Sequence, residues 1–424
     1  MKKGNAENVL LGILTSALVV ALIYILNEPN SSEISSSYNN QINNYGENII
    51  AEQENITNYA YNLNETQEAE PLQVFDNYKN NRFYYNQLSL KQKLVYETLE
   101  KGFNNFSSVI KIGNSSTDDL VIAVHSIGMD HPEFYWIDQY NCITMNGLVV
   151  EARFEVPSDA SETIDKINTK VDSIIYQMNF KGLNSDYDKI KFFYDWIITN
   201  TDYYQAPDSQ TITSVFVNNK SVCSGYSKAF LYLCQKVGIE CAFVAGYTNN
   251  DNTHAWNLVK IGNNYYWVDT TWGDPVFAGE ADQNINYSYF LVDDTDFLKN
   301  HKIEYTVQSQ INMDSIKAFE YPSCNDSSLN YYKKIGAYFN HLNANDISIF
   351  LREKFKNNEL DNIELEFKEK DDYNYFIEEY LKKENARIFD EIRNYFVFEE
   401  GSIYISYETI ERAQYVKIKI EMKK

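Results

Sequence analysis

The chain has 424 residues, and its 37 lysines and arginines against 60 acidic residues give a net charge of −23. Nucleic-acid binding depends on basic surfaces that neutralise phosphates, so this charge argues against a nucleic-acid partner and against attraction to anionic lipid. Glycine and proline are scarce, with 16 and 7 residues, whereas tyrosine and phenylalanine supply 35 and 24. This composition excludes collagen-like and low-complexity chains and predicts about two or three folded domains with aromatic cores.

An uncharged and mostly apolar run lies near the N-terminus, from 8 to 27. A helix of about 20 residues spans about 30 Å, the thickness of the hydrocarbon core of a bilayer. Lys2 and Lys3 precede the run and Glu28 follows it, so the positive-inside rule places the rest of the chain outside the cytoplasm. We expect a cytoplasmic tail and single-pass cell-membrane anchor over 1–27. The alternative is a signal peptide, whose cleavage would release a secreted protein.

The next segment, 28–81, is rich in asparagine, serine, glutamine and glutamate. It contains nine acidic residues and a single basic residue, Lys79. Such a segment cannot bury enough apolar surface to offset the entropy lost on ordering. We therefore predict a disordered acidic linker that holds the folded part away from the membrane.

Helical and strand-like patterns alternate from residue 82 onward. Ser89 followed by Gln92 predicts a capping box that begins a helix. In chain order, we expect helices over 89–101, 118–127, 161–178, 188–200 and 227–237, and strands over 134–138, 148–154, 240–246, 254–261 and 265–271. After residue 303, we expect helices over 328–339, 345–357 and 373–395, and strands over 363–367, 402–407 and 414–421. The last group predicts a small accessory α+β domain over 303–424.

One of five scattered cysteines stands at a helix start. The cysteines are odd in number and widely spaced, so they do not have the pattern of a disulfide framework. Cys223 comes where an amphipathic helix begins, and the N–H groups and dipole of a helix N-terminus stabilise a thiolate. Cys234 falls inside this helix and Cys241 inside an apolar strand, so we expect both to be buried. Cys223 is therefore the candidate nucleophile, and its backbone N–H is a candidate donor to an oxyanion.

A predicted hairpin brings two further polar residues together. Gly262 and Asn263 fit a two-residue loop between the strands 254–261 and 265–271, and such a loop fixes the register of the pair. In this register, His254 and Asp269 are diagonal neighbours on one face, with Cβ atoms somewhat less than about 7–8 Å apart.

Side chains at this separation can reach each other through a hydrogen bond. We predict that His254 takes the proton of Cys223 and that Asp269 fixes the tautomer of the imidazole and stabilises its cation. A single histidine in a strand is more often a structural residue, but the helix-start cysteine and the hairpin register favour the catalytic interpretation.

Other candidate sites are weaker. The acidic stretch 293–296 lacks the twelve-residue pattern of a calcium loop. His125 and His131 have no neighbouring ligands in a zinc spacing. We expect neither a metal nor another cofactor. Three aromatic residues are candidates for lining a cleft, and packing in the core is an equal alternative for the two tryptophans: Tyr226, Trp256 and Trp272.

Three blocks in order resemble the transglutaminase-like superfamily and its papain-like fold. They are Ser-Val-Cys-Ser-Gly-Tyr at 221–226, Thr-His-Ala-Trp-Asn at 253–257, and Val-Asp-Thr-Thr-Trp-Gly-Asp-Pro at 268–275. The similarity extends over 82–302, with the core at about 186–302, and includes an N-terminal extension like that of bacterial members. The closing segment of those members is similar to the region of Tyr289 and His301.

The resemblance implies an α+β fold in which a cysteine-bearing helix packs on an antiparallel sheet. An N-terminal α/β extension, a C-terminal α+β domain and the N-terminal membrane helix would complete the chain. It also implies thiol-mediated acyl transfer on protein or peptide amides, by Cys223, His254 and Asp269 and without a cofactor. The expected membrane anchor would place this activity at the cell surface. The acyl group would pass to water or to an amine. The alternative is a catalytically silent interaction module on the same fold.

Overall fold

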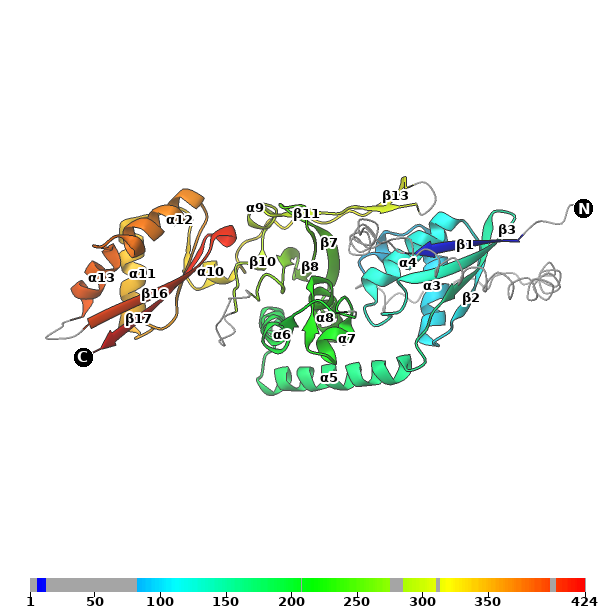
Figure 1. Cartoon of the computed structure of the whole chain (residues 1–424), viewed down its shortest axis with the longest axis horizontal. Coiled ribbons are helices and arrows are strands. Elements are labelled where there is room, and N and C mark those ends of the chain that lie inside the picture. The colour runs from blue at the N-terminus through cyan, green and yellow to red at the C-terminus, as the bar shows by residue number, and fades with distance from the viewer. Residues whose placement is uncertain are drawn as a thin grey trace, which may run out of the picture. The chain divides into compact units, whose positions relative to one another are not determined.

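A computed structural model shows the arrangement of the chain (Figure 1). It describes residues 6–12, 82–206, 208–274, 285–309, 313–396 and 402–423. The predicted linker over 28–81 and most of the predicted membrane segment lie outside these residues.

The first described element corrects part of the expected membrane helix. β1 (Ala6–Gly12) is a strand that pairs antiparallel with β3 (Gln139–Met145), so residues 8–12 are not helical. A short apolar run fits a buried strand as well as a helix, and periodicity cannot distinguish the two. Among the described residues, no helix has both the length and the apolar character needed to cross a bilayer.

The N-terminal part places helices beside a four-stranded sheet in the order β1-β3-β4-β2. Its elements are η2 (Tyr85–Gln87), α3 (Leu90–Asn104), β2 (Val109–Ser115), α4 (Thr117–Asp130), β3 and β4 (Leu148–Phe154). The predicted capping box is present, because Ser89 Oγ accepts from the Gln92 N–H and the Gln92 side chain accepts from the Ser89 N–H. The predicted strand over 134–138 is wrong. Phe134 packs on Phe103 there, with ring centroids 5.4 Å apart, so the apolar pattern reflects core packing.

The central part packs helices against a five-stranded antiparallel sheet in the order β10-β9-β8-β7-β11. Its helices are α5 (Ala160–Phe180), α6 (Asp186–Asn200), α7 (Ile212–Phe216), α8 (Cys223–Lys236) and α9 (Asp294–Phe297). Its strands are β5 (Asp202–Tyr203), β6 (Lys220–Ser221), β7 (Cys241–Thr248), β8 (Thr253–Ile261), β9 (Asn264–Val268), β10 (Phe290–Val292) and β11 (His301–Ile303). α8 lies on β7 and β8 (Figure 1), and the buried Asn257 side chain of β8 donates to the Ser227 carbonyl of α8.

The hairpin of β8 and β9 has the register that the sequence predicts. Ile261 faces Asn264, and pairing continues to Asn257 and Val268. Gly262 has a φ of 61°, the left-handed conformation that a tight hairpin loop requires and glycine adopts without strain. The second strand ends at Val268 rather than at 271, because the next residues turn around the Asp269 side chain.

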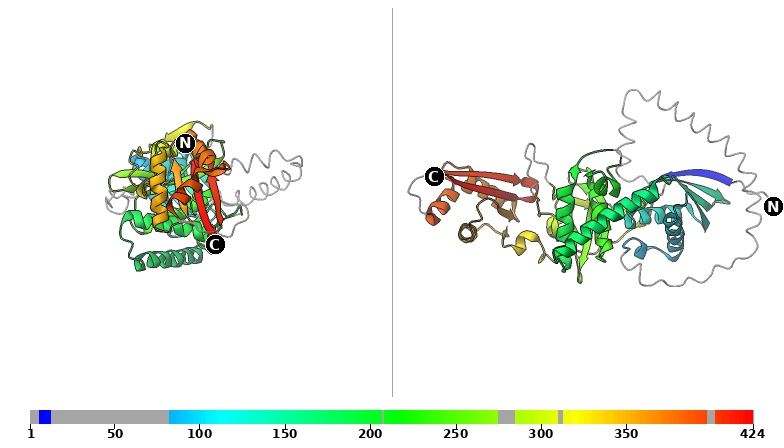
Figure 2. Two further views of the ribbon diagram at one scale, coloured as in Figure 1. Left: turned by 90° about the vertical axis from the view of Figure 1, so that its left-hand side faces the viewer. Right: turned by 90° about the horizontal axis from the view of Figure 1, so that it is seen from below.

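The C-terminal part contains a hairpin and a second mixed domain. The hairpin strands are β12 (Thr306–Gln308) and β13 (Ser315–Ala318). A four-stranded sheet in the order β14-β15-β17-β16 follows, and helices lie along one face of it (Figure 2). These elements are α10 (Tyr331–Lys334), β14 (Tyr338–Phe339), α11 (Ala344–Lys356), β15 (Ile363–Phe367), α12 (Lys370–Phe376), the π-helix η3 (Ile377–Lys382), α13 (Arg387–Tyr395), β16 (Ser402–Ile410), η4 (Glu411–Ala413) and β17 (Tyr415–Lys423).

Two long helices predicted in this region are interrupted. The one over 328–339 stops before Gly336, which has a φ of 71°, and gives way to a strand. The one over 373–395 breaks where Lys383 takes an extended conformation.

The boundary of the accessory domain is not marked by a separate core, because buried Phe319 belongs to the same apolar cluster as the N-terminal part. The exact domain limits therefore stay a prediction.

Gly225 in the first turn of α8 permits a close approach of the chain before the helix. A Cβ atom there would lie 2.8 Å from the Ser209 carbonyl oxygen and 2.0 Å from Ser221 Oγ. The same carbonyl accepts from Ser221 Oγ at 2.8 Å and from the Val222 N–H at 3.1 Å. This contact fixes the segment that leads into Cys223.

Replacing Gly225 with alanine is expected to lower the free energy of unfolding by about 1–3 kcal/mol, because a backbone carbonyl cannot move aside as a flexible side chain would. Gly128 inside α4 is a matched control, since the nearest atom to an added Cβ is 3.6 Å away. Gly128→Ala should be neutral or stabilise by up to about 1 kcal/mol. Urea titrations of both variants measure the difference, and equal stability of the two would contradict the packing argument.

Candidate active site

Cys223 is the first residue of α8, as the sequence predicts. The residue before it, Val222, is extended, so the helix begins abruptly at the cysteine. Cys223 is half-buried, whereas the other four cysteines are buried, which confirms the expectation for Cys234 and Cys241. Cys223 is therefore the thiol that solvent or a substrate can reach, and it lies at the positive end of a helix dipole.

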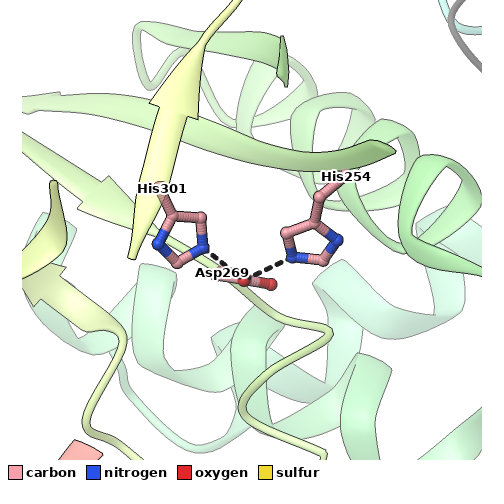
Figure 3. Close-up of side chains that lie close together, drawn as sticks. All are labelled: His254, Asp269 and His301. Carbon is pink, nitrogen blue, oxygen red and sulfur yellow. Dashed lines mark hydrogen bonds and ion pairs between the residues drawn. The ribbon is translucent and has the colours of Figure 1, made fainter. Parts of the chain in front are cut away.

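The carboxylate of Asp269 lies between two imidazole rings (Figure 3). Its Oδ2 atom is 2.7 Å from Nε2 of His254 on β8 and 3.1 Å from Nε2 of His301 on β11. Asp269 directly follows β9, so three strands of one sheet bring the three side chains together. The predicted contact between His254 and Asp269 is thus present, and a second histidine shares the same oxygen.

The other carboxylate oxygen of Asp269 is bound by the chain that follows it. Oδ1 accepts from the Thr271 N–H at 2.9 Å and from the Trp272 N–H at 3.0 Å. The side chain is completely buried, which by itself would raise the pKa of the carboxyl group. The charges and hydrogen bonds of the two histidines outweigh this burial and hold the pKa below its usual value, so Asp269 is ionised.

The environment of His254 favours an imidazolium. Burial alone would lower the pKa of the ring, but the charge and hydrogen bond of Asp269, assisted by contact with Cys223, raise the pKa to about 10. Asp269 binds Nε2, so Nδ1 is the ring nitrogen available to the Cys223 thiol. An imidazolium at this position stabilises a thiolate, which is the nucleophilic form of cysteine.

His301 is a residue whose role the sequence does not predict. Its Nδ1 atom lies 2.9 Å from Asn300 Oδ1 and 3.2 Å from the Phe297 carbonyl oxygen, while Nε2 faces Asp269. Both ring nitrogens therefore face oxygen atoms, which by itself would favour the doubly protonated ring. Burial and the positive charge of His254 outweigh this effect and lower the pKa of His301, so His301 loses its proton before His254 as the pH rises. The only feature of the sequence that pointed to His301 was its position in the region that is similar to the closing segment of family members.

Tyr203 on β5 is a second residue whose role the sequence does not predict. Burial and the nearby Cys223 raise the pKa of its hydroxyl to about 12, so the hydroxyl lies close to the cysteine. The residue is 45% exposed. The strand pair of β5 and β6 holds it there, because Tyr203 faces Ser221.

The three aromatic candidates have different environments. Trp272 is half-buried, with its ring centroid 5.3 Å from that of His254 and 4.4 Å from that of His301. Trp256 is completely buried, and its ring centroid is 4.9 Å from that of His301. Tyr226 is also buried, and its hydroxyl donates to Asp274 Oδ2 at 2.9 Å. Of the three, Trp272 is placed to line the site, whereas Trp256 and Tyr226 support it from the core.

The two histidines and Asp269 are also residue types that can hold a metal ion. Their candidate ligand atoms lie within 4.8 Å of one another. Both Nε2 atoms, however, contact one carboxylate oxygen at hydrogen-bond distance, so a metal ion would have to displace those bonds. Hydrogen bonding accounts for the geometry without a metal.

Comparison with known proteins identifies the class of this central part. Residues 176–271 match the family model of the transglutaminase-like superfamily, and this range includes Cys223, His254 and Asp269. The chain therefore contains a transglutaminase-like core domain, which confirms the resemblance found in the sequence.

Two curated relatives are similar to part of the chain. The kyphoscoliosis peptidase of Mus musculus is 22% identical over 178 residues, which cover 37% of this chain and 27% of the relative. The kyphoscoliosis peptidase of Homo sapiens is 25% identical over 138 residues, which cover 28% of this chain and 21% of the relative. The chain thus matches about a quarter of the length of these relatives.

One solved structure, a crystal structure of a TGase, is 14% identical with a TM-score of 0.25. The matched region covers 46% of this chain and 52% of the chain in the solved structure.

The raised pKa of His254 predicts how stability changes with pH. A group whose pKa is raised on folding contributes stability that is complete below its unfolded pKa of about 6.5 and is lost as the pH rises toward 10. His254→Gln should therefore lower the free energy of unfolding by at least about 2 kcal/mol near pH 6.5, and the loss should shrink toward pH 10.

Urea titrations between pH 6 and 10 measure this difference. His341→Gln is the matched control, because His341 is exposed on the surface, and it should follow the wild-type profile. A deficit in His254→Gln that stayed constant over this pH range would show that no titrating pair with Asp269 is involved.

Proposed function

We propose that this protein is a cysteine enzyme that transfers an acyl group from a protein or peptide amide through the thiol of Cys223. The observation that carries the proposal is the hydrogen-bonded pair of His254 and Asp269 beside a half-buried cysteine at a helix N-terminus. The transglutaminase-like core supports the same class of chemistry.

Each residue of the site has its own role in the proposed reaction. His254 takes the thiol proton at Nδ1, and the thiolate of Cys223 attacks the amide carbon. The amine then leaves with the proton from His254, and a thioester remains on the sulfur. Asp269 keeps the imidazole in the required orientation and stabilises its positive charge throughout. His301 holds Asp269 from the other side as a positioning residue.

The negative oxygen of the tetrahedral intermediate needs hydrogen-bond donors. The backbone N–H of Cys223 at the start of α8 is the first candidate. The hydroxyl of Tyr203 lies close to Cys223 and is our candidate for the second donor. Tyr203 and Cys223 are both partly exposed, so a substrate carbonyl can approach them from the solvent.

The acceptor of the acyl group is water or an amine. The name of the curated relatives favours hydrolysis, and the name of the superfamily favours transfer to an amine. Incubation with a glutamine peptide and a tagged amine distinguishes the two. Incorporation of the tag means transfer, and release of ammonia or peptide cleavage without the tag means hydrolysis.

We also propose that the enzyme works outside the cytoplasm on surface proteins or peptides. The support is the charge pattern around the apolar N-terminal run. Residues 8–12 cannot be a strand of the sheet and the start of a membrane helix at the same time. Alkaline extraction of membranes from cells expressing the full chain, with protease protection, decides between an anchored, a released and an internal protein.

The enzyme proposal predicts selective reactivity of one thiol. An amide-mimicking electrophile should modify wild-type protein at least about 100-fold faster than Cys223→Ala, because the imidazolium of His254 favours the thiolate. Cys234→Ala is the control and should react like the wild type, since Cys234 is buried in α8. Mass spectrometry locates the modification. Equally slow labelling of every cysteine would leave the silent interaction module as the better interpretation.

A further inference from the structure

The accessory domain reaches the proposed active site through the tip of one hairpin. η4 (Glu411–Ala413) connects β16 and β17, and it carries Arg412. The guanidinium carbon of Arg412 lies 4.7 Å from the centre of the Trp272 ring, the same ring that stacks on His254. A cationic side chain of the C-terminal domain is thus separated from the catalytic imidazole by one tryptophan.

Hydrogen bonds hold this tip in place. Asn300 Nδ2 is 3.3 Å from the Arg412 carbonyl oxygen, and Asn300 Oδ1 accepts from His301 at 2.9 Å. The backbone of Arg412 is therefore joined through Asn300 and His301 to the Asp269 carboxylate. The backbone that carries the guanidinium is thus tied to the site.

The donors of Arg412 are unused in the described part of the chain. Its side chain is exposed, and no described residue forms a hydrogen bond or an ion pair with its guanidinium. Lys299, another nearby cation, is instead bound to Asp296 at 2.9 Å. A guanidinium with free donors beside a reacting centre is suited to bind a carboxylate in bidentate fashion.

A small hollow with a cavity volume of about 30 Å³ adjoins Arg412. Polar groups line it, with Tyr289, Asn300 and Gln414 among them. Two acidic residues also line the hollow, but neither leaves an uncompensated negative charge. Asp296 is paired with lysines, and burial raises the pKa of Glu366 to about 8, so Glu366 is mostly protonated at neutral pH. Arg412 therefore gives the hollow a positive character on a strongly acidic protein.

We propose that Arg412 and this hollow form a subsite for a carboxylate of the substrate, so that amides flanked by an acidic residue are preferred. The consequence for catalysis rests on the proposed function, whereas binding at the subsite can be measured without it. The accessory domain then has a definite role, since it supplies the residue that selects the substrate.

Binding is measured with the full chain carrying Cys223→Ala. Fluorescent peptides contain one glutamine, with either glutamate or glutamine at each of the two positions on either side of it. We expect at least one glutamate peptide to bind about threefold to tenfold more tightly than its neutral counterpart, and less so in 0.5 M salt. Adding Arg412→Ala should abolish this difference and leave the neutral peptides unchanged, while Arg412→Lys should retain part of it.

Arg393→Ala is the matched control, because Arg393 is an exposed arginine of the same domain that also lies over an aromatic ring, that of Phe389. It should keep the full preference. The proposal is overturned if no position shows a preference for glutamate, or if Arg412→Ala retains the preference.

Reaction rates of electrophilic versions of the same peptides with Cys223 test the proposed function separately. A preference in binding that depends on Arg412, without selective modification of Cys223, would keep the subsite and reject the enzyme. Selective modification of Cys223 without any effect of Arg412→Ala on the preference would keep the enzyme and reject the subsite.

Discussion

One buried carboxylate constrains the centre of this molecule. Asp269 has no exposure to solvent, and an ion in such a place is tolerated only when hydrogen bonds replace its hydration. Four donors do so, from two imidazoles and two backbone N–H groups. These donors come from β8, from β11 and from the turn after β9, so the charge is stable only when all three have reached their places. The site and the end of the sheet therefore form as one unit.

The local part of this arrangement could be predicted from the sequence. A two-residue loop fixes the register of a hairpin, and that register brings His254 and Asp269 within reach of each other. A helix start next to Cys223 follows from the apolar spacing after it. Each inference uses residues close together in the chain, where loop length or helical period leaves few alternatives.

What could not be predicted depends on contacts between distant segments. His301 reaches Asp269 because β11 pairs with β7, at the opposite edge of the sheet from β10, and no periodicity in the sequence encodes that pairing. The prediction of a strand over 134–138 was wrong for a related reason. The aromatic residues there pack in the core, but their backbone does not pair with another strand. The place of Arg412 likewise depends on the packing of the accessory domain against Trp272.

The order of these residues along the chain has a consequence for biosynthesis. Every described hydrogen-bond donor to the Asp269 carboxylate lies between His254 and His301, whereas the arginine over Trp272 belongs to a hairpin that leaves the ribosome later. The thiol and its partners can thus assemble while the C-terminal sheet is still being translated. During that interval, a nascent chain holds the charge cluster while no arginine lies over Trp272, and the interval ends when the hairpin of β16 and β17 has been translated.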